Sequence, residues 1–243
     1  MSVFHEGRVI ENRHWTEALF SLRVEGVRLS FRAGQFVRIG LEPSLVRAFS
    51  FVNPPEDPVL EFYGIVVPEG PLSPRLAKLE AGDRLLVASN PAGFLVLDEV
   101  PECEVLWLVA TGTGIAPFLS ILRTDAPWQR FRHVVLVHAV RHARELVYAE
   151  VVGQIRQRNE NIFRYVSFVS RENRAGSLAG RVPAAMRDGR LEAAAGVPLD
   201  ERSHVMLCGN PAMLKDAQAA LIERGLRKHR RRNPGHISVE SFW

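Results

Sequence analysis

The residues best suited to bind a nucleotide form a glycine-rich turn, Thr111–Pro117 (TGTGIAP). The turn joins a continuous apolar run to residues with helical spacing. Such a turn can hold a phosphate, because backbone N–H groups approach closely at glycine and a helix N-terminus adds partial positive charge. A tight strand-to-helix turn without a ligand is the alternative. Pro117 departs from the GxGxxG fingerprint, and Arg132 and His133 stand where an acid for a ribose hydroxyl would follow, which disfavours a plain NAD site.

Arginines follow the predicted strands at the edge where parallel sheets bind their ligands. Arg141 and Arg171 each come just after a strand, and Arg181 lies ten residues beyond the second. Guanidinium groups bind phosphate bidentately, although any one of these side chains can equally be a solvated surface arginine. Several arginines at one sheet edge, with no acid for the 2′-hydroxyl, predict NADP rather than NAD.

Two further segments carry residue types that contact cofactors. Arg47-Ala48-Phe49-Ser50 places arginine and phenylalanine on one face of a predicted strand and the hydroxyl on the other, although an ordinary barrel strand has the same pattern. Cys208-Gly209-Asn210-Pro211 ends a buried strand at a helix start, where a structural buried cysteine is the alternative. The terminal Phe242-Trp243 pair is expected to pack in the core or to cover a flat group.

The elements that must position these residues fall into two halves. Up to about Asp98, short apolar runs alternate with turn residues, which predicts an antiparallel barrel or sandwich. Strands are expected at 20–24, 35–41, 48–53, 60–67 and 84–89, with a short helix at 73–79.

The second half alternates strand and helix patterns, which predicts a parallel sheet covered on both faces. Strands are expected at 105–110, 133–139, 163–170, 204–208 and 237–242. Helices are expected after the glycine turn, with Phe118, Ile121 and Leu122 on one face, and at 146–158 and 211–223.

Composition narrows the classes of protein. The chain has 243 residues, a net charge of +4 and only two cysteines, Cys103 and Cys208. Two thiols cannot form a disulfide framework or ligate an iron–sulfur cluster, and no metal site is expected. No apolar run is long enough to span a membrane, and the first residues lack a signal-peptide pattern, so a cytoplasmic protein is expected.

Five motifs, taken together and in order, resemble bacterial ferredoxin/flavodoxin–NADP reductases from end to end. They are Arg47-Ala48-Phe49-Ser50, Gly70-Pro71-Leu72-Ser73, Ala110-Thr111-Gly112-Thr113-Gly114, Cys208-Gly209-Asn210-Pro211 and Glu240-Ser241-Phe242-Trp243. The resemblance implies two domains. Residues 1–98 would form an FAD-binding antiparallel Greek-key β-barrel. Residues 99–243 would form an NADP-binding α/β parallel-sheet domain whose C-terminal residues contact FAD.

The resemblance also implies an activity and its residues. NADPH and FAD would exchange a hydride between nicotinamide C4 and flavin N5, and single electrons would then pass to ferredoxin or flavodoxin. The expected catalytic residues are Ser50, Cys208, Glu240 and Phe242. The expected FAD-binding residues are Arg47, Ala48, Phe49, Ser50, Tyr63, Gly64, Ile65, Val66, Pro71, Leu72, Ser73, Thr113, Phe242 and Trp243. The expected NADP-binding residues are Thr113, Val140, Arg141, Ser170, Arg171, Arg181, Cys208 and Asn210.

Individual roles follow from the same resemblance. Arg47 would hold the FAD pyrophosphate, and Phe49 and Phe242 would cover the two flavin faces. Phe242 would move aside for the nicotinamide, and Trp243 would stack on the adenine. The family usually has tyrosine at Phe49 and commonly at Phe242, so this chain keeps the stacking area but loses a hydroxyl, which affects the flavin potential.

A basic run near the end of the chain, formed by Arg227, Lys228, His229, Arg230, Arg231 and Arg232, is interpreted in two ways. It is either a solvated face or a docking surface for an acidic ferredoxin or flavodoxin. Nucleic-acid binding is disfavoured because no base-reading helix accompanies it. A monomer is expected. A ferric or free-flavin reductase, an oxygenase reductase component and a non-catalytic flavin redox sensor stay open as alternatives on the same fold.

Overall fold

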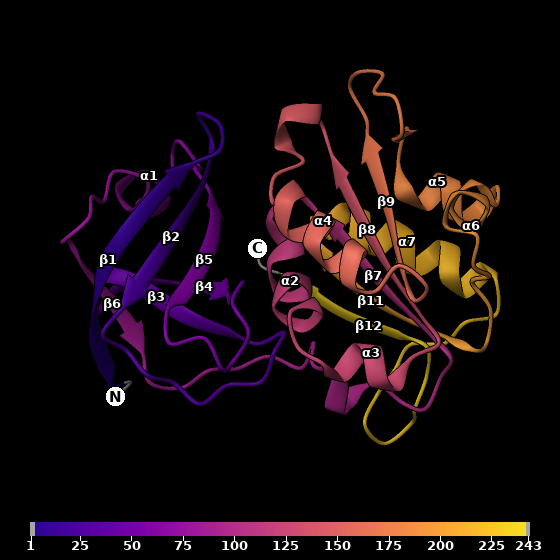
Figure 1. Cartoon of the computed structure of the whole chain (residues 1–243), viewed down its shortest axis with the longest axis horizontal. Coiled ribbons are helices and arrows are strands. Elements are labelled where there is room, and N and C mark those ends of the chain that lie inside the picture. Colours follow the sequence, from indigo (N-terminus) through magenta and orange to yellow (C-terminus); the bar gives the residue numbers. More distant parts are fainter. Residues whose placement is uncertain (1–2, 242–243) are drawn as a thin grey trace. The chain divides into compact units, whose positions relative to one another are not determined.

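Two six-stranded sheets organise the computed structural model, which describes residues 3–241 (Figure 1). The chain divides into two units by its internal contacts. The first unit runs through Val96 and includes Ala116–Thr124, and the second contains Leu97–Ile115 and the chain from Asp125 onward. The chain therefore leaves the second unit after the glycine turn, contributes one helix to the first, and returns.

The first unit is an antiparallel sheet that closes on itself. Its strands follow the order β4-β3-β6-β1-β2-β5. Beyond the end of β4, Phe51 pairs with Phe62 of β5, and the Val52 N–H donates to the Glu61 carbonyl at 2.9 Å, so the two outer strands meet. The strands are β1 (Phe4–His14), β2 (Leu19–Glu25), β3 (Phe36–Glu42), β4 (Leu45–Ser50), β5 (Leu60–Ile65) and β6 (Arg84–Ala88). The predicted antiparallel Greek-key barrel is confirmed.

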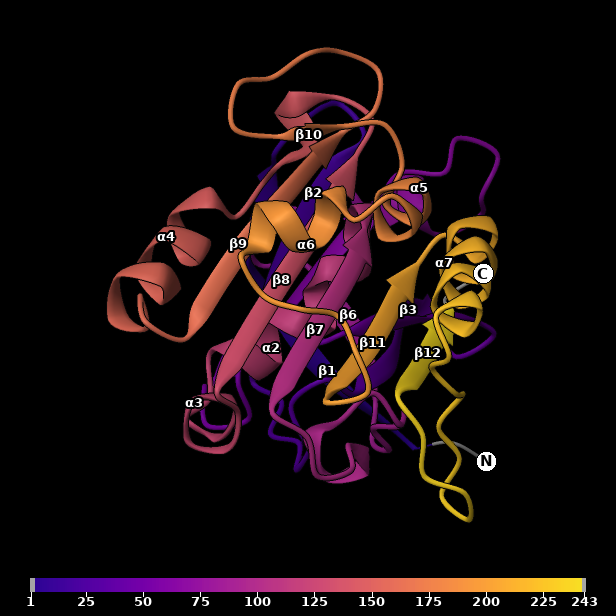
Figure 2. The same ribbon diagram turned by 90° about the vertical axis from the view of Figure 1, so that its right-hand side faces the viewer.

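The second unit is a parallel sheet with helices, as predicted (Figure 2). Its strands follow the order β10-β9-β8-β7-β11-β12. They are β7 (Val105–Thr111), β8 (His133–Val140), β9 (Phe163–Val169), β10 (Leu178–Ala179), β11 (Ser203–Gly209) and β12 (Ile237–Ser241). The helices are α3 (Ala126–Arg130), α4 (Ala149–Arg158), α5 (Val182–Arg187), α6 (Arg190–Ala195) and α7 (Pro211–Glu223). Short 3₁₀ turns are η1 (Leu97–Glu99), η2 (Gly112–Ile115) and η3 (Ala143–Glu145).

Strand order in the parallel sheet reverses at β7. The chain adds β8, β9 and β10 on one side of β7, and then returns to add β11 and β12 on the other. Ligands of open parallel sheets bind at the carboxyl ends of the strands next to such a switch point. The ends of β7 and β11 are therefore the place to look for a nucleotide site.

The helix after the glycine turn differs from its prediction. All seven residues of α2 (Ala116–Leu122) are buried, so the helix has no solvent face, and it belongs to the first unit. Its Ser120 hydroxyl donates to the Asn53 carbonyl at 2.7 Å. The helical spacing of Phe118, Ile121 and Leu122 predicts a single buried face. The small residues Ala116 and Ser120 carry no strong hydrophobic signal in the sequence, so their burial was not predicted.

Several predicted boundaries are corrected. The strand expected at 48–53 is β4, which begins at Leu45 and ends at Ser50. The helix expected at 73–79 is the shorter α1 (Ser73–Leu76). The helix expected at 146–158 begins only at Ala149, because Tyr148 adopts a left-handed conformation with a φ of 61°. The prediction missed β1, since few of its side chains are buried and its alternation is weak.

Candidate functional site

The glycine turn lies at the switch point and packs on the end of β11. Gly112 has a φ of +53°, which favours glycine. A Cβ at Gly114 would come within 2.5 Å of the Cys208 carbonyl oxygen, so only glycine fits there. The turn and the Cys208 segment, which are far apart in sequence, therefore form one structure at the carboxyl edge of the sheet.

The β11 side of this structure is equally constrained. Gly209 has a φ of +134°, and a Cβ there would meet the Thr111 hydroxyl at 2.2 Å. That hydroxyl accepts a hydrogen bond from the Asn210 N–H at 2.9 Å. The Asn210 side chain caps α7, accepting from Ala212 and Met213 N–H groups at 3.0 and 3.2 Å. Thr111 is thus a positioning residue that the sequence analysis did not single out.

Cys208 is buried as a neutral thiol. It pairs in register with Glu240 of β12, and burial, followed by the negative charge of Glu240, raises the pKa of the Cys208 thiol well above its usual value. A protonated thiol is a compact packing group rather than a thiolate nucleophile. Its place at the end of β11 suits contact with a ligand seated on the glycine turn.

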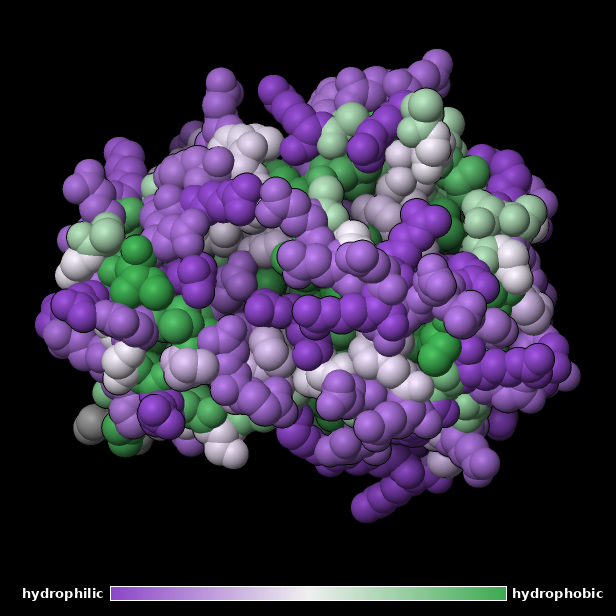
Figure 3. Space-filling view, viewed as in Figure 1, coloured by the Kyte–Doolittle hydropathy of each residue, from purple (hydrophilic) through white to green (hydrophobic). Residues whose placement is uncertain are grey.

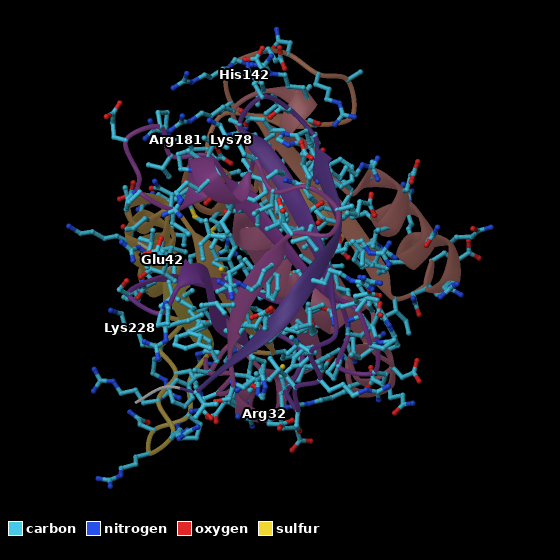
Figure 4. All side chains as sticks on the ribbon, turned by 90° about the vertical axis from the view of Figure 1, so that its left-hand side faces the viewer. Arg32, Glu42, Lys78, His142, Arg181 and Lys228 are labelled. Atoms are coloured by element: carbon cyan, nitrogen blue, oxygen red, sulfur yellow. The ribbon has the colours of Figure 1, made fainter. Side chains whose placement is uncertain are left out.

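The predicted arginines occupy the carboxyl ends of β8, β9 and β10. The Arg171 N–H donates to the Arg141 carbonyl at 2.9 Å, and the Ser170 N–H and hydroxyl both donate to the Val140 carbonyl at 3.1 and 3.2 Å. Two loops are thereby joined, and Arg141 and Arg171 lie side by side. Arg181 follows β10 and is the N-cap residue of α5. Figure 4 labels Arg181 and the loop residue His142.

The two acids of the loops after β8 and β9 bind backbone N–H groups. They therefore form no ion pairs with the arginine side chains of the same loops. Glu145 accepts from the N–H groups of Arg141 and His142 at 2.9 and 3.3 Å, and Glu172 accepts from the Ala143 N–H. Within residues 3–241, five exposed arginines at this edge have no ion pair: Arg141, Arg144, Arg171, Arg174 and Arg181. We missed Arg144 and Arg174 in the sequence, although each stands three residues after a predicted arginine.

The first unit assembles the other predicted set. Phe49 and Gly64 lie on β4 and β5, and a Cβ at Gly64 would come within 2.9 Å of the Phe49 ring. Ser50 is only 5% exposed, and its hydroxyl has no hydrogen-bond partner among the described residues. An unpartnered buried hydroxyl beside a phenylalanine seat is the arrangement that a ring with hydrogen-bonding edges would complete.

Hydrogen bonds hold both ends of α1, the short helix that follows β5. The Ser73 hydroxyl accepts from the Val67 N–H at 2.9 Å. Asn12 of β1 donates through its side-chain amide to the Ala77 and Leu79 carbonyls at 3.0 and 2.8 Å, at the end of α1. Asn12 therefore anchors the carboxyl end of α1, the helix that begins at Ser73, a role that no local sequence signal indicates.

The structure leaves several of the predicted site residues untested. Phe242 and Trp243 lie outside the described residues, so their expected contacts stay predictions. Arg47 is exposed, and its guanidinium donates to the Val46 carbonyl at 2.8 Å. No group of three or more metal-ligating side chains occurs among residues 3–241. No helix in this part of the chain has the length and apolarity to cross a bilayer.

The basic run forms a hairpin, residues 227–236, at the opposite edge of the parallel sheet (Figure 2). It leads into the amino end of β12, where Ile237 pairs with Val205. Arg231 forms an ion pair with Glu99, with an Nε–Oε2 distance of 2.9 Å. Among the described residues, Arg227, Lys228, Arg230 and Arg232 are exposed and make no ion pair.

The class of protein follows from four features: the antiparallel barrel, the parallel sheet, the glycine turn at its switch point, and the exposed arginines at the carboxyl ends of its strands. Together they are typical of a two-domain nucleotide-dependent oxidoreductase. Residues 108–219 match the family model of the oxidoreductase NAD-binding domain. Over 242 residues, 98% of each chain, the protein is 51% identical to flavodoxin/ferredoxin–NADP reductase of Escherichia coli. It is 38% identical to ferredoxin–NADP reductase of Pseudomonas aeruginosa, over 99% of this chain and 98% of that one.

The structural comparison agrees with the sequence comparison. A crystal structure of ferredoxin NADP⁺ reductase from Neisseria gonorrhoeae, with bound FAD and NADP, superposes with a TM-score of 0.94 at 33% identity and full coverage of both chains. The chain belongs to the flavodoxin/ferredoxin–NADP reductase family. The resemblance stated from the five motifs is confirmed.

Proposed function

We propose that the protein transfers electrons between NADPH and ferredoxin or flavodoxin, with FAD as its cofactor. The packing of the glycine turn on the Cys208 strand end, at the switch point of the parallel sheet, carries this proposal. The likeness to reductases over 98% of the chain supports the same function. When bound, FAD supplies the conversion between two-electron and one-electron transfer.

In the first unit, the residues present fit a flavin. The unpartnered hydroxyl of Ser50 provides a hydrogen bond to a ring edge, and the Phe49 ring beside Gly64 provides a flat apolar surface. Arg47 is exposed and forms no ion pair with any residue that the structure describes, so it is available for a diphosphate. The full proposed FAD set is Arg47, Ala48, Phe49, Ser50, Tyr63, Gly64, Ile65, Val66, Pro71, Leu72, Ser73 and Thr113, together with Phe242 and Trp243.

In the second unit, the residues present fit NADP rather than NAD. Arg141 and Arg171 are exposed and form no ion pair among residues 3–241, and a backbone hydrogen bond joins the two loops that carry them. Their guanidinium groups suit a 2′-phosphate, which NAD lacks. Arg144 and Arg174 add positive charge to the same two loops. The proposed NADP set is Thr113, Val140, Arg141, Ser170, Arg171, Arg181, Cys208 and Asn210. The assignment of residues 1–98 to FAD and 99–243 to NADP is part of this proposal.

Cys208, Glu240 and Ser50 have separate roles at the proposed site of hydride exchange. Cys208 presents a protonated, compact thiol beside the glycine turn, and Glu240 stands next to it in register. Ser50 donates or accepts one hydrogen bond. These residues orient bound groups and exclude water, and no general base is required for hydride exchange.

Purified protein tests this function through its absorption spectrum and its nucleotide preference. We expect stoichiometric bound FAD and NADPH-dependent reduction of ferricyanide. In an R141A/R171A variant, KM for NADPH should rise about 10- to 100-fold, while KM for NADH changes little. A colourless protein that refuses FAD contradicts the proposal. Flavin consumed as a diffusing substrate would indicate a free-flavin reductase, and bound FAD without ferricyanide reduction would indicate a sensor.

We also propose that the basic hairpin attracts an acidic carrier protein. It lies at the amino end of β12, roughly 13 Å along this strand from Ser241, so its charge acts at a distance. Neutralising Arg230 and Arg232 to glutamine should lower kcat/KM for the carrier about three- to tenfold at low salt, and high salt should abolish the difference. Glutamine at Arg156 and Arg158 of α4 is the matched control. A loss that persists in high salt would contradict this role.

Location and oligomeric state complete the proposal. Both cysteines are free thiols, which fits a reducing cytoplasm. On the face drawn in Figure 3, hydrophilic residues predominate and hydrophobic ones lie in separate groups. We propose a monomer, as expected from the sequence, and the elution volume of the purified protein in size-exclusion chromatography tests it.

A further inference from the structure

His138 of β8 is a buried titratable side chain that the proposed mechanism leaves without a task. It is fully buried and lies in register between Ala110 of β7 and Ser167 of β9. Its Nε2 atom is 3.1 Å from the Gly112 carbonyl oxygen, which belongs to the glycine turn. A polar ring in the middle of a sheet core is costly unless its hydrogen bond serves the structure.

The geometry defines which ring nitrogen carries the proton. The Gly112 carbonyl can only accept, so Nε2 must donate, and the neutral ring then has a bare Nδ1. Nδ1 is buried and has no partner among the described residues. In the other tautomer two lone pairs would face each other at Gly112, and the Nδ1–H would also be unsatisfied. The Nε2–H form is therefore the one that this site holds.

The ring stays neutral over the working range of pH. Burial lowers the pKa of His138 to about 4, and the hydrogen bond to Gly112, followed by the charge of Glu145, only partly opposes that effect. Glu145 is itself engaged by the N–H groups of Arg141 and His142. The His138 donor is thus present with the same strength at every pH where the enzyme would operate.

The turn is held at two places. On the β11 side, Gly114 packs on the Cys208 carbonyl, and the Thr111 hydroxyl accepts from the Asn210 N–H. On the β8 side, His138 provides the described hydrogen bond to the turn, at a glycine whose φ of +53° is unfavourable for other residues. Without that bond, the Gly112 carbonyl loses its polar contact with β8, and the 3₁₀ turn η2 relies on its own backbone bonds and on the contacts on the β11 side.

We propose that His138 is a positioning residue for the nicotinamide nucleotide: its Nε2–H binds the Gly112 carbonyl and thereby holds the conformation of the glycine turn, which is the proposed nucleotide seat. This inference rests on the proposed function, since it takes the glycine turn to be the nucleotide seat. His138 does not touch the nucleotide itself. Its effect is on binding, through the conformation of the turn.

Three substitutions at one position test the inference. His138→Gln keeps an N–H donor near the place of Nε2, His138→Asn moves the donor towards the place of Nδ1, and His138→Leu removes it. We expect KM for NADPH to rise about three- to tenfold in the leucine and asparagine variants, the size of one buried hydrogen bond, with kcat within twofold. The glutamine variant should recover most of the affinity. His133→Gln, at the amino end of the same strand, is the matched control.

Bound FAD and thermal melting show whether each variant is folded. An unchanged KM for NADPH in a folded leucine variant, or no difference between glutamine and asparagine, would overturn the inference. Nitrogen-15 NMR of the wild-type imidazole gives a readout that needs no activity and no variant, and a protonated Nδ1 would overturn it as well. A wild-type protein that oxidises no NADPH contradicts the proposed function instead, and the NMR result still decides whether the hydrogen bond exists.

Discussion

At the scale of single residues, the carboxyl edge of the parallel sheet carries both charged and uncharged polar groups. The arginines there form no ion pair among the described residues, and the cysteine there is protonated. Arg141 and Arg171 keep their charge available because Glu145 and Glu172 are bound to backbone N–H groups. Cys208, by contrast, is held protonated by burial and by Glu240, which raise its pKa. An edge with exposed arginines and an uncharged packing surface are thereby built on one end of a sheet.

Replacement of Ser50 by alanine tests the buried hydroxyl of the barrel. The hydroxyl has no hydrogen-bond partner among residues 3–241, so its removal costs the fold little. We expect S50A to keep its FAD and its melting temperature, while the rate of hydride transfer in single-turnover measurements falls about tenfold or more. Equal single-turnover rates in the two proteins would refute a role for Ser50 in the reaction.

At the scale of elements, α2 follows the second unit in sequence but belongs to the first unit. It follows the glycine turn of the parallel sheet but is buried within the first unit. Arg123, just beyond it, donates to the Val52 carbonyl at 3.3 Å and forms ion pairs with Glu61 at 3.4 Å and Asp57 at 3.7 Å. The helix is thus anchored in the barrel by polar contacts at its carboxyl end.

Substitution of Arg123 by alanine should destabilise the protein by about 1–3 kcal/mol. The variant removes a guanidinium that is only 28% exposed at its side chain from two partly buried carboxylates and from the Val52 carbonyl. Urea unfolding measures the change. Arg132→Ala is the control, because its pairing with Glu104 at 3.9 Å is exposed and contributes little. Equal midpoints for the two variants would contradict the anchoring of α2.

At the scale of the whole molecule, buried neutral histidines couple stability to pH. Burial lowers the pKa of His138 to about 4, and burial together with the nearby His229 lowers that of His204 to about 3. Burial also lowers the pKa of His133 and His236. The unfolded chain takes up these protons near pH 6.5, and the folded protein does so only at lower pH, so acid favours unfolding.

Unfolding free energies at pH 7 and pH 5 test this coupling. His138 and His204 should each lower the stability by roughly 2 kcal/mol at pH 5, at ~1.4 kcal/mol per pH unit below the unfolded pKa. The pKa values of Asp188, Asp200, Glu192 and Glu223 are lowered from their usual values near 4, so these groups lose their contribution only in stronger acid. The His138→Gln variant should lose less stability than the wild type between the two pH values. An unaltered pH slope in His138→Gln would contradict the coupling.

The predictability of each element followed its pattern of burial. The helix at 211–223 was predicted with the bounds that the structure has, because Asn210 and Pro211 mark its start and one face is apolar. Strands buried on both faces, such as β7 and β8, were equally clear. The 11-residue β1 escaped prediction because most of its side chains face solvent. α3, α5 and α6 were too short to show a helical period.

The amino-acid sequence by itself determined the two-part architecture, the glycine turn, the arginines at the strand ends and the family, because these depend on local patterns and on motif order. Only the tertiary structure decided that the turn packs on Cys208, that α2 belongs with the barrel, and that His138, Thr111 and Asn12 hold the site segments. Those contacts join residues that lie far apart along the chain. Their partners are selected by strand order and register, which no single segment encodes.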